Sequence, residues 1–331
     1  MEELKPSYME LYKSGELERR VRALEARLEN CDVCPRDCHI NRLAGKTGYC
    51  HSGHRAVISS FCAHHGEEPV ISGNRGSGTI FFGYCNMRCV YCQNFQISQD
   101  YRQESKEVAA DVLAGHMLYL QNELDCHNIN LVSPSHVVPQ IIRAVLMAVP
   151  RGLHLPLVYN TSSYDSVASL RELDGIVSIY LADLRYASDH WAGELSGAKD
   201  YVERAREAVA EMYRQVGDLK VDDNGLARQG LIVRLLVLPD RIGGCAESLR
   251  WLAGAISPDV TVSAMSQYYP VHKANLYPAL SRKITPEEYE EVTGVMEELG
   301  MENGWVQEII APESYRPDFS REMPFPAEGE K

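Results

Sequence analysis

The sequence lacks any stretch that could cross a membrane or direct secretion. No uncharged apolar run approaches the roughly 20 residues that span a bilayer. The segment Met1–Lys13 contains three glutamates and no apolar core of a signal peptide. We therefore expect a cytoplasmic protein without a membrane segment.

Basic residues are scarce. The 33 Lys and Arg residues face 46 Asp and Glu residues, which gives a formal net charge of −13. Proteins that bind nucleic acid usually need a positive surface to meet the phosphate backbone. The charge therefore argues against a nucleic-acid partner.

Cysteine is abundant, and its placement is uneven. The chain has 10 cysteines, of which only Cys126 and Cys245 lie beyond residue 92. Disulfides are rare in a reducing compartment, so clustered thiols there indicate metal binding. The two distant cysteines are expected to be buried thiols.

The N-terminal residues 1–75 are predicted to form a helix and a cysteine-rich segment that binds metal. Apolar residues at Leu17, Val21, Leu24 and Leu28 recur with the helical period. Residues 31–75 show no clean period and are predicted to be loops organised by metal. Within them, four cysteines are predicted to form a second metal site, either a zinc or an auxiliary iron–sulfur cluster: Cys31, Cys34, Cys38 and Cys50.

From residue 76 to 311, short apolar runs alternate six times with helical patterns. The predicted strands are Thr79–Phe82, Ile129–Val132, Leu155–Tyr159, Ile176–Leu181, Leu231–Leu238 and Val260–Ala264. The predicted helices are Val108–Glu123, Val137–Val149, Ser166–Leu173, Ala198–Val216, Ser248–Ile256 and Pro286–Leu299. This alternation predicts an α/β fold with a parallel sheet, either an open doubly wound sheet or a partial (β/α)6 TIM-like barrel.

Two further features bear on this fold. No G-x-G-x-x-G motif follows the first strand, which argues against a dinucleotide-binding domain. In both remaining architectures the active site lies at the carboxyl ends of the strands. Residues 312–331 contain several prolines and are predicted to form an extended tail.

Three cysteines follow the first predicted strand in a tight loop. Cys85, Cys89 and Cys92 have the spacing C-x3-C-x2-C. Three thiolates can bind three irons of a 4Fe–4S cluster and leave the fourth iron open for a ligand. A zinc site with a distant fourth ligand, or an electron-transfer cluster completed by another cysteine, fits the spacing as an alternative.

The cysteine motif resembles that of the radical S-adenosylmethionine superfamily, whose C-x3-C-x-Φ-C loop follows the first strand of a partial (β/α)6 barrel. Other segments are similar to pyruvate formate-lyase-activating-enzyme-like proteins of that superfamily. These segments are CPRDC, HHGEEPVISG, GSGTIFF, CVYCQN, NINLVSPSH, YNTSSYD, VLP and SQYYP. The resemblance covers nearly the whole chain.

The resemblance implies a set of residues that bind S-adenosylmethionine. The aromatic Tyr91 would contact adenine, and Ser133 or Ser135 would replace the family's Gly-Gly-Glu at the methionine amino group. Ser135 could instead cap the following helix. Asn160 and Asp183 follow the third and fourth strands, and Asp183-Leu-Arg185 stands where activating enzymes tend to have Asp-x-Lys.

Arg234 lies in a strand that is apolar enough to be buried on both faces. A buried guanidinium needs an anion beside it. That anion is either a barrel carboxylate such as Asp183 or the carboxylate of S-adenosylmethionine. A cluster of histidine and glutamate at His64, His65, Glu67 and Glu68 is interpreted as a solvated turn that ends at Pro69, rather than a metal or acid–base site.

The function implied by the resemblance is reductive cleavage of S-adenosylmethionine at a 4Fe–4S cluster, which yields a 5′-deoxyadenosyl radical that abstracts hydrogen. The substrate would be a glycyl residue on a partner enzyme, or a small metabolite or peptide. A reductant protein such as flavodoxin or ferredoxin would supply the electron. The alternative from another class is an iron–sulfur electron carrier without enzymatic activity.

Overall fold

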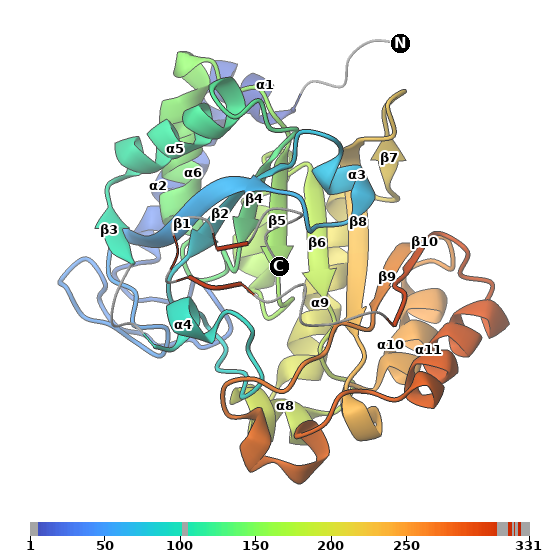
Figure 1. Cartoon of the computed structure of the whole chain (residues 1–331). Coiled ribbons are helices and arrows are strands. Elements are labelled where there is room, and N and C mark those ends of the chain that lie inside the picture. The colour runs from blue at the N-terminus through green and yellow to red at the C-terminus, as the bar shows by residue number, and fades with distance from the viewer. Residues whose placement is uncertain (1–5, 101–104, 310–316, 320, 322–323, 326–331) are drawn as a thin grey trace.

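A curved β-sheet forms the centre of the protein (Figure 1). The computed structural model describes residues 6–100, 105–309, 317–319, 321 and 324–325. Within these residues, the sheet order is β10-β9-β8-β6-β5-β4-β2-β1-β3, and β7 pairs with β8. The strands are β1 (Ala56–His64), β2 (Ser77–Phe82), β3 (Lys106–Val108), β4 (Ile129–Val132), β5 (Leu157–Thr161), β6 (Ile179–Asp183), β7 (Lys220–Val221), β8 (Ala227–Leu236), β9 (Thr261–Met265) and β10 (Gly304–Val306).

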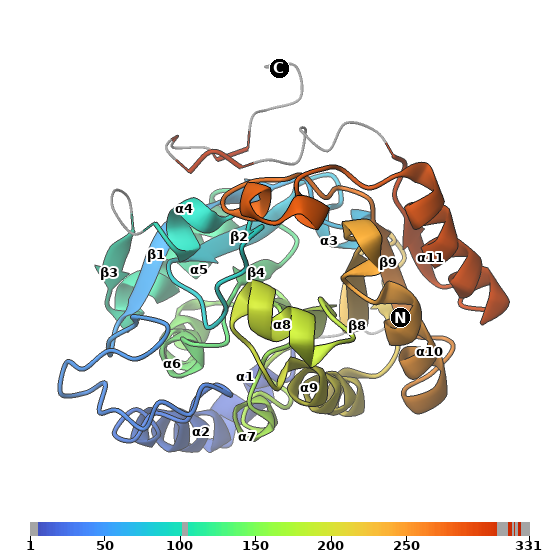
Figure 2. The ribbon, with the colours of Figure 1, turned by 90° about the horizontal axis from the view of Figure 1, so that it is seen from below.

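Helices follow the parallel strands and cover the outside of the curved sheet (Figure 2). The α-helices are α1 (Tyr8–Lys13), α2 (Glu16–Ala26), α3 (Pro69–Ser72), α4 (Phe95–Ser98), α5 (Ala110–Asn122), α6 (Val138–Ala148), α7 (Val167–Arg171), α8 (Asp189–Ser196), α9 (Tyr201–Val216), α10 (Cys245–Ala255) and α11 (Pro286–Glu298). Short 3-10 helices span Val149–Arg151, Pro239–Arg241, Ala274–Leu276 and Pro278–Leu280.

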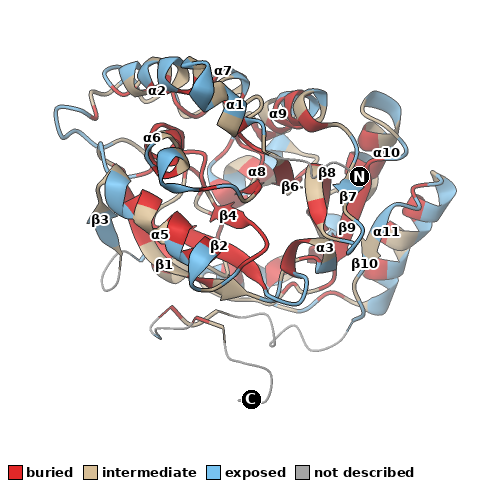
Figure 3. Ribbon diagram, turned by 90° about the horizontal axis from the view of Figure 1, so that it is seen from above, coloured by how far each residue is buried: buried red, intermediate tan, exposed pale blue. Residues whose placement is uncertain are grey.

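Six parallel strands form the predicted units, in the order β2, β4, β5, β6, β8 and β9, and each is followed by at least one helix. Every side chain of β4, β5 and β6 is buried, because the helices cover one face and the barrel interior the other. The prediction of an α/β partial (β/α)6 barrel is confirmed. Figure 3 shows the buried residues concentrated on these strands and exposed residues on the outer faces of α2 and α11.

The N-terminal helix is confirmed as an amphipathic element that packs on the barrel. Leu17, Val21 and Leu24 of α2 are fully buried in the main core. On its polar side, Glu25 forms an ion pair with Arg143 of α6. Burial of the apolar face, rather than propensity alone, stabilises so short a helix.

The prediction that residues 31–75 are loops was wrong for their second half. Strand β1 pairs antiparallel with β2, so that Phe61 lies opposite Ile80 and His64 opposite Ser77. The predicted domain boundary between residues 75 and 76 therefore separates two adjacent strands of one sheet. Helix α3 follows β1, and its Ile71 packs against Val158, Ile179, Leu181 and Ile232 inside the barrel.

The predicted tail, residues 312–331, lies largely outside the described residues. Among the parts that are described, the Phe319 ring lies 5.3 Å from that of Phe81 in β2, and the Phe325 ring 3.9 Å from that of His64. These rings cover one side of the barrel interior. In the described part of the chain, no helix combines the length and apolar character required to cross a bilayer.

Candidate active site at the strand ends

A cavity of about 1620 Å³ occupies the barrel interior and reaches the carboxyl ends of the parallel strands. The loop after β2, the ends of β4, β5, β6, β8 and β9 and the turn between β1 and α3 all contribute to its wall. Among the predicted site residues, those that line the cavity are Tyr91, Cys92, Ser133, Asn160, Asp183 and Arg234. The fold thus brings these six side chains to one cavity, whereas Cys85 and Cys89 lie on the same loop as Cys92 but do not line it.

Ser135 does not line this cavity. Its hydroxyl lies 3.1 Å from the Thr161 hydroxyl, in a buried group that also contains Asp165. The alternative that Ser135 caps the next helix was wrong, because α6 begins after Val137 and has no side-chain cap. Binding of the cofactor by Ser135 stays a prediction. Ser133, by contrast, adopts a left-handed backbone conformation with φ of 58° and faces the cavity.

The three cysteines of the loop after β2 each accept or share a hydrogen bond at sulfur. The Met87 N–H donates to the Cys85 Sγ over 3.3 Å, and the Ser196 hydroxyl donates to the Cys89 Sγ over 3.0 Å. The Cys92 Sγ lies 3.4 Å from the Ser98 hydroxyl. Such donors stabilise sulfur that carries negative charge.

Burial makes the Cys85 thiol hard to ionise without a cation. Burial, together with the neighbouring thiols Cys89 and Cys92, raises the pKa of Cys85 to about 12. The Cys85 thiol would therefore be protonated at neutral pH unless a metal displaced its proton. Within the residues that the structure describes, no three His, Cys, Asp or Glu side chains are grouped as ligands of a single metal ion.

Arg185 is a partly buried cation beside this loop. Its Nη2 lies 2.6 Å from the Asp183 Oδ2, and its charge favours ionisation of Cys85 and Cys92. Its Nε is buried, and none of the described residues forms a hydrogen bond with it. The Nε–H of Arg185 is thus a buried donor available to an anion in the cavity.

Arg234 forms the predicted ion pair with Asp183 at a distance of 2.7 Å between Nε and Oδ1. Its other two nitrogens are also engaged, Nη2 with the Asn160 Oδ1 at 2.6 Å and Nη1 with the Glu67 Oε2 at 3.1 Å. Of the two anions predicted for Arg234, the structure contains the barrel carboxylate of Asp183. Binding of a cofactor carboxylate to Arg234 stays a prediction.

Glu67 is a site residue that the sequence interpretation missed. It does not lie in a solvated turn: its side chain is only 9% exposed and reaches into the barrel. Its Oε1 accepts hydrogen bonds from the side-chain amides of Asn130 at 3.0 Å and Asn160 at 3.3 Å. Glu67 therefore links the β1–α3 turn to β4, β5 and β8.

The neighbouring residues of this turn also line the cavity. Glu68 is 8% exposed, and burial raises its pKa above the ordinary glutamate value. Its Oε2 has no hydrogen-bond partner in the described part of the chain. Burial lowers the pKa of His64 to about 4, so its imidazole is neutral at pH 7. The site thus combines fixed charges with a neutral imidazole and a carboxyl group whose pKa is raised.

The residues after β9 divide between cavity and core. Gln267 lines the cavity, and its carbonyl accepts a hydrogen bond from the Gln93 side chain at 3.2 Å. Tyr268 is instead buried in the core, where its hydroxyl donates to the Leu280 carbonyl. Cys126 and Cys245 are buried thiols, as predicted.

Comparison with known proteins gives one relative in sequence and distant resemblances in structure. No family model matches the chain. The uncharacterized protein MJ0674 of Methanocaldococcus jannaschii is 27% identical over 305 residues, which is 89% of this chain and 82% of the relative. Among solved structures, native anSMEcpe with bound AdoMet matches 70% of this chain with a TM-score of 0.42 and 10% identity. HydG, a maturase of the FeFe-hydrogenase, matches 68% with a TM-score of 0.43 and 12% identity. The matches span 59% and 50% of those two chains.

Proposed function

We propose that the chain is a radical S-adenosylmethionine enzyme in which Cys85, Cys89 and Cys92 hold a 4Fe–4S cluster. When bound, the cluster and S-adenosylmethionine supply one-electron cleavage of the cofactor to a 5′-deoxyadenosyl radical that abstracts a hydrogen atom. One observation supports the proposal: Cys92, on the same loop after the first parallel strand as Cys85 and Cys89, lines a cavity whose wall is polar at the strand ends. Three thiolates leave one iron open, as a catalytic centre requires.

The chain's own residues would hold and orient the cofactor. Tyr91 lies within the loop, between Cys89 and Cys92, where it is buried with its ring 6.0 Å from that of Tyr268, and it would pack against adenine. Arg185 offers its unpartnered Nε to the cofactor carboxylate. Ser133 and Asn160 offer polar groups to the amino group and the ribose. Asp183 would keep both arginines in place through its two oxygens.

Arg234 belongs in this proposal as a second cation near the carboxylate. Each of its three nitrogens already has an acceptor, so a cofactor carboxylate would either compete with Asn160 or Glu67 or take the second N–H of Nη1 or Nη2. Because Arg234 pairs with Asp183 and Glu67, we propose that its main contribution is to hold these two side chains in position. A folded Arg234→Ala variant with unchanged cofactor affinity would limit Arg234 to the ion pairs.

The substrate would enter the same cavity. Pockets for small ligands commonly measure about 300–1,000 Å³, so 1620 Å³ offers room for a cofactor and a further molecule. We propose either a glycyl residue on a partner enzyme or a small metabolite or peptide. A reductant protein such as flavodoxin or ferredoxin would deliver the electron. Nothing in the acidic charge balance favours a nucleic-acid substrate.

Electron paramagnetic resonance tests the proposal. Protein reconstituted without oxygen and reduced with dithionite should show a 4Fe–4S signal, and added S-adenosylmethionine should shift it by binding the open iron. An electron carrier whose cluster has four protein ligands would give the signal without the shift. The absence of a shift in protein with a full cluster would therefore contradict the enzyme and support the carrier.

A further inference from the structure

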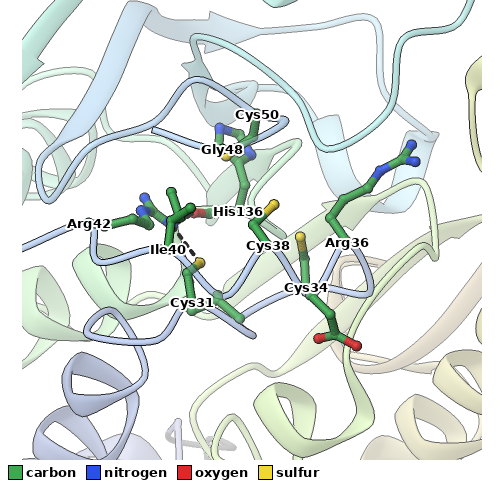
Figure 4. A pocket seen from close by; sticks show the side chains of 11 residues that line it. Cys31, Cys34, Arg36, Cys38, Ile40, Arg42, Gly48, Cys50 and His136 are labelled. Carbon is green, nitrogen blue, oxygen red and sulfur yellow. Dashed lines mark hydrogen bonds between the residues drawn. The ribbon is translucent and has the colours of Figure 1, made fainter. Parts of the chain in front are cut away.

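Four cysteines outside the barrel surround a small cavity of their own. Cys31, Cys34, Cys38 and Cys50 line it, and Figure 4 shows their side chains around one space. They belong to the segment between α2 and β1. Its backbone closes through hydrogen bonds from the Cys31 N–H to the Ile40 carbonyl and from the His39 N–H to the Cys31 carbonyl. Burial and the three neighbouring thiols raise the pKa of Cys34.

A glycine permits this arrangement. A Cβ added at Gly48 would lie 2.7 Å from the Cys38 Sγ and 2.9 Å from its Cβ. Real side chains do not approach so closely, so any larger residue would displace Cys38 from the group. The segment between Cys38 and Cys50 therefore depends on a residue without a side chain at this point.

Arg42 is a buried cation on the wall of this cavity. It is 1% exposed, and its nitrogens donate to the carbonyls of Gly53 at 2.9 and 2.7 Å and His136 at 2.8 Å. Its Nη1 also lies 3.9 Å from the Cys31 Sγ. Among the described residues, no carboxylate forms an ion pair with it. A buried guanidinium needs a counter-anion, and thiolates gathered on a metal would provide one.

His136 presents a free nitrogen on the same wall. It is 1% exposed, and its Nε2 lies 3.0 Å from the Gly83 carbonyl. A carbonyl can only accept, so Nε2 carries the proton in the neutral ring. Nδ1 is then an acceptor, and it is buried without a partner among the described residues. An imidazole nitrogen in this state is a metal ligand or an acceptor for a group bound nearby.

We propose that Cys31, Cys34, Cys38 and Cys50 form a second metal centre, separate from the Cys85 loop, with Arg42 as its counter-cation and His136 as an adjoining nitrogen ligand or acceptor. The metal is one that thiolates prefer, a zinc ion or an iron–sulfur cluster. The described side chains do not group three ligands for a single ion, so binding requires the thiols to move closer together. A change of side-chain rotamer provides such a movement.

Two arginines connect this centre to the Cys85 loop. Arg36 donates from Nε to the Asn86 carbonyl at 2.7 Å, and Arg88 donates to the Tyr49 carbonyl at 2.8 Å. Both guanidinium groups lie over the Tyr49 ring, at 3.8 and 4.2 Å from its centre. Metal binding beside Cys50 would therefore fix the loop that carries Cys85 and Cys89.

Metal analysis of a full-length variant tests the second centre independently of the proposed function. The Cys85→Ala/Cys89→Ala/Cys92→Ala chain removes the loop cluster and should still bind metal. About one zinc per chain identifies a zinc site, and about four irons with matching sulfide identify a cluster. Neither metal, in a variant that is folded by circular dichroism and exposed to both zinc and iron–sulfide reconstitution, overturns the proposal.

A second comparison does not depend on whether the Cys85→Ala/Cys89→Ala/Cys92→Ala chain folds. In the otherwise wild-type chain, Cys34→Ser/Cys50→Ser should lower total metal by the amount found above, whereas Cys126→Ser/Cys245→Ser should not. Arg42→Met should weaken metal retention against a chelator at least tenfold. Equal metal content in the two double variants would overturn the assignment to these four cysteines.

Discussion

The carboxylate of Glu67 lies 3.1 Å from the guanidinium of Arg234, although the two residues are 167 positions apart in the chain. The pair joins the turn after β1 to strand β8 in the middle of the barrel. Both side chains are nearly buried, with Glu67 9% and Arg234 14% exposed. If one of the two charges were removed, water could therefore do little to solvate the charge that remains. The contact makes the segment before the first parallel strand part of the candidate site.

Removal of Glu67 should destabilise the protein markedly. Glu67→Ala leaves Arg234 with one fewer anion and frees the amides of Asn130 and Asn160, and we expect a loss of about 3–5 kcal/mol in the free energy of unfolding. Urea unfolding measures it. Glu10→Ala is the control, because its pair with Lys13 is exposed and should contribute about 1 kcal/mol or less. Equal effects of the two substitutions would show that the Glu67 pair is not a structural contact.

Arg185 should control affinity for S-adenosylmethionine. If its free Nε binds the cofactor carboxylate, Arg185→Met should weaken binding by about 1.5–3 kcal/mol, roughly 10- to 150-fold. Equilibrium binding to the reconstituted protein measures the change. Arg228→Met is a matched control, since Arg228 has similar exposure and also pairs with an aspartate, but it does not line the cavity. A folded Arg185→Met variant with wild-type affinity would remove Arg185 from the cofactor site.

His64 should make stability depend on pH in the acid range. Its pKa is lowered from 6.5 to about 4 by burial, so the unfolded chain binds a proton more readily than the folded one. The contribution of neutral His64 to the free energy of unfolding is fully present above about pH 6.5. It is lost as the pH falls through 4, by about 3 kcal/mol in total. His64→Gln should flatten this part of the pH profile relative to wild type. His190→Gln, at an exposed position, should leave the profile unchanged, and identical profiles for all three proteins would refute the prediction.

Gly48 should be essential to the four-cysteine site. Gly48→Ala places a methyl group against Cys38, and we expect the Cys85/Cys89/Cys92→Ala protein that carries this change to retain less than half of its metal. Gly115→Ala is the control, because a Cβ at Gly115 in α5 meets nothing within 4 Å. Metal analysis after desalting compares the two. Full retention in the Gly48→Ala protein would show that Cys38 is not a ligand.

The alternation of strands and helices was predictable because the parallel strands are largely buried on both faces and are therefore mostly apolar. Strand β4 has the predicted bounds, and the other five parallel strands shift by a few residues at their ends. Strand β1 was missed because its pattern is mixed, with buried residues at Ala56 to Ile58 and partly exposed ones from Ser59 to Phe61. Its place in the sheet comes from pairing with β2, which no local pattern reveals.

The candidate site was predictable where a charged residue stands in an otherwise apolar segment. Arg234 interrupts an apolar strand, and the free-energy cost of burying its charge unpaired indicated an anion such as Asp183. Glu67 gave no such signal, because glutamate beside Gly66 and Pro69 is typical of an exposed turn. Its partners Asn130 and Arg234 come from strands far along the chain, so only the fold identifies its role.

The most direct test of the central claim is production of 5′-deoxyadenosine from S-adenosylmethionine by reconstituted, dithionite-reduced protein. Wild type and the Cys245→Ala control should form it, and the Cys85→Ala/Cys89→Ala/Cys92→Ala variant should form none if the three thiolates of this loop hold the cluster, as we propose. Product from the triple variant, or none from wild-type protein with a full cluster, would contradict the proposed function.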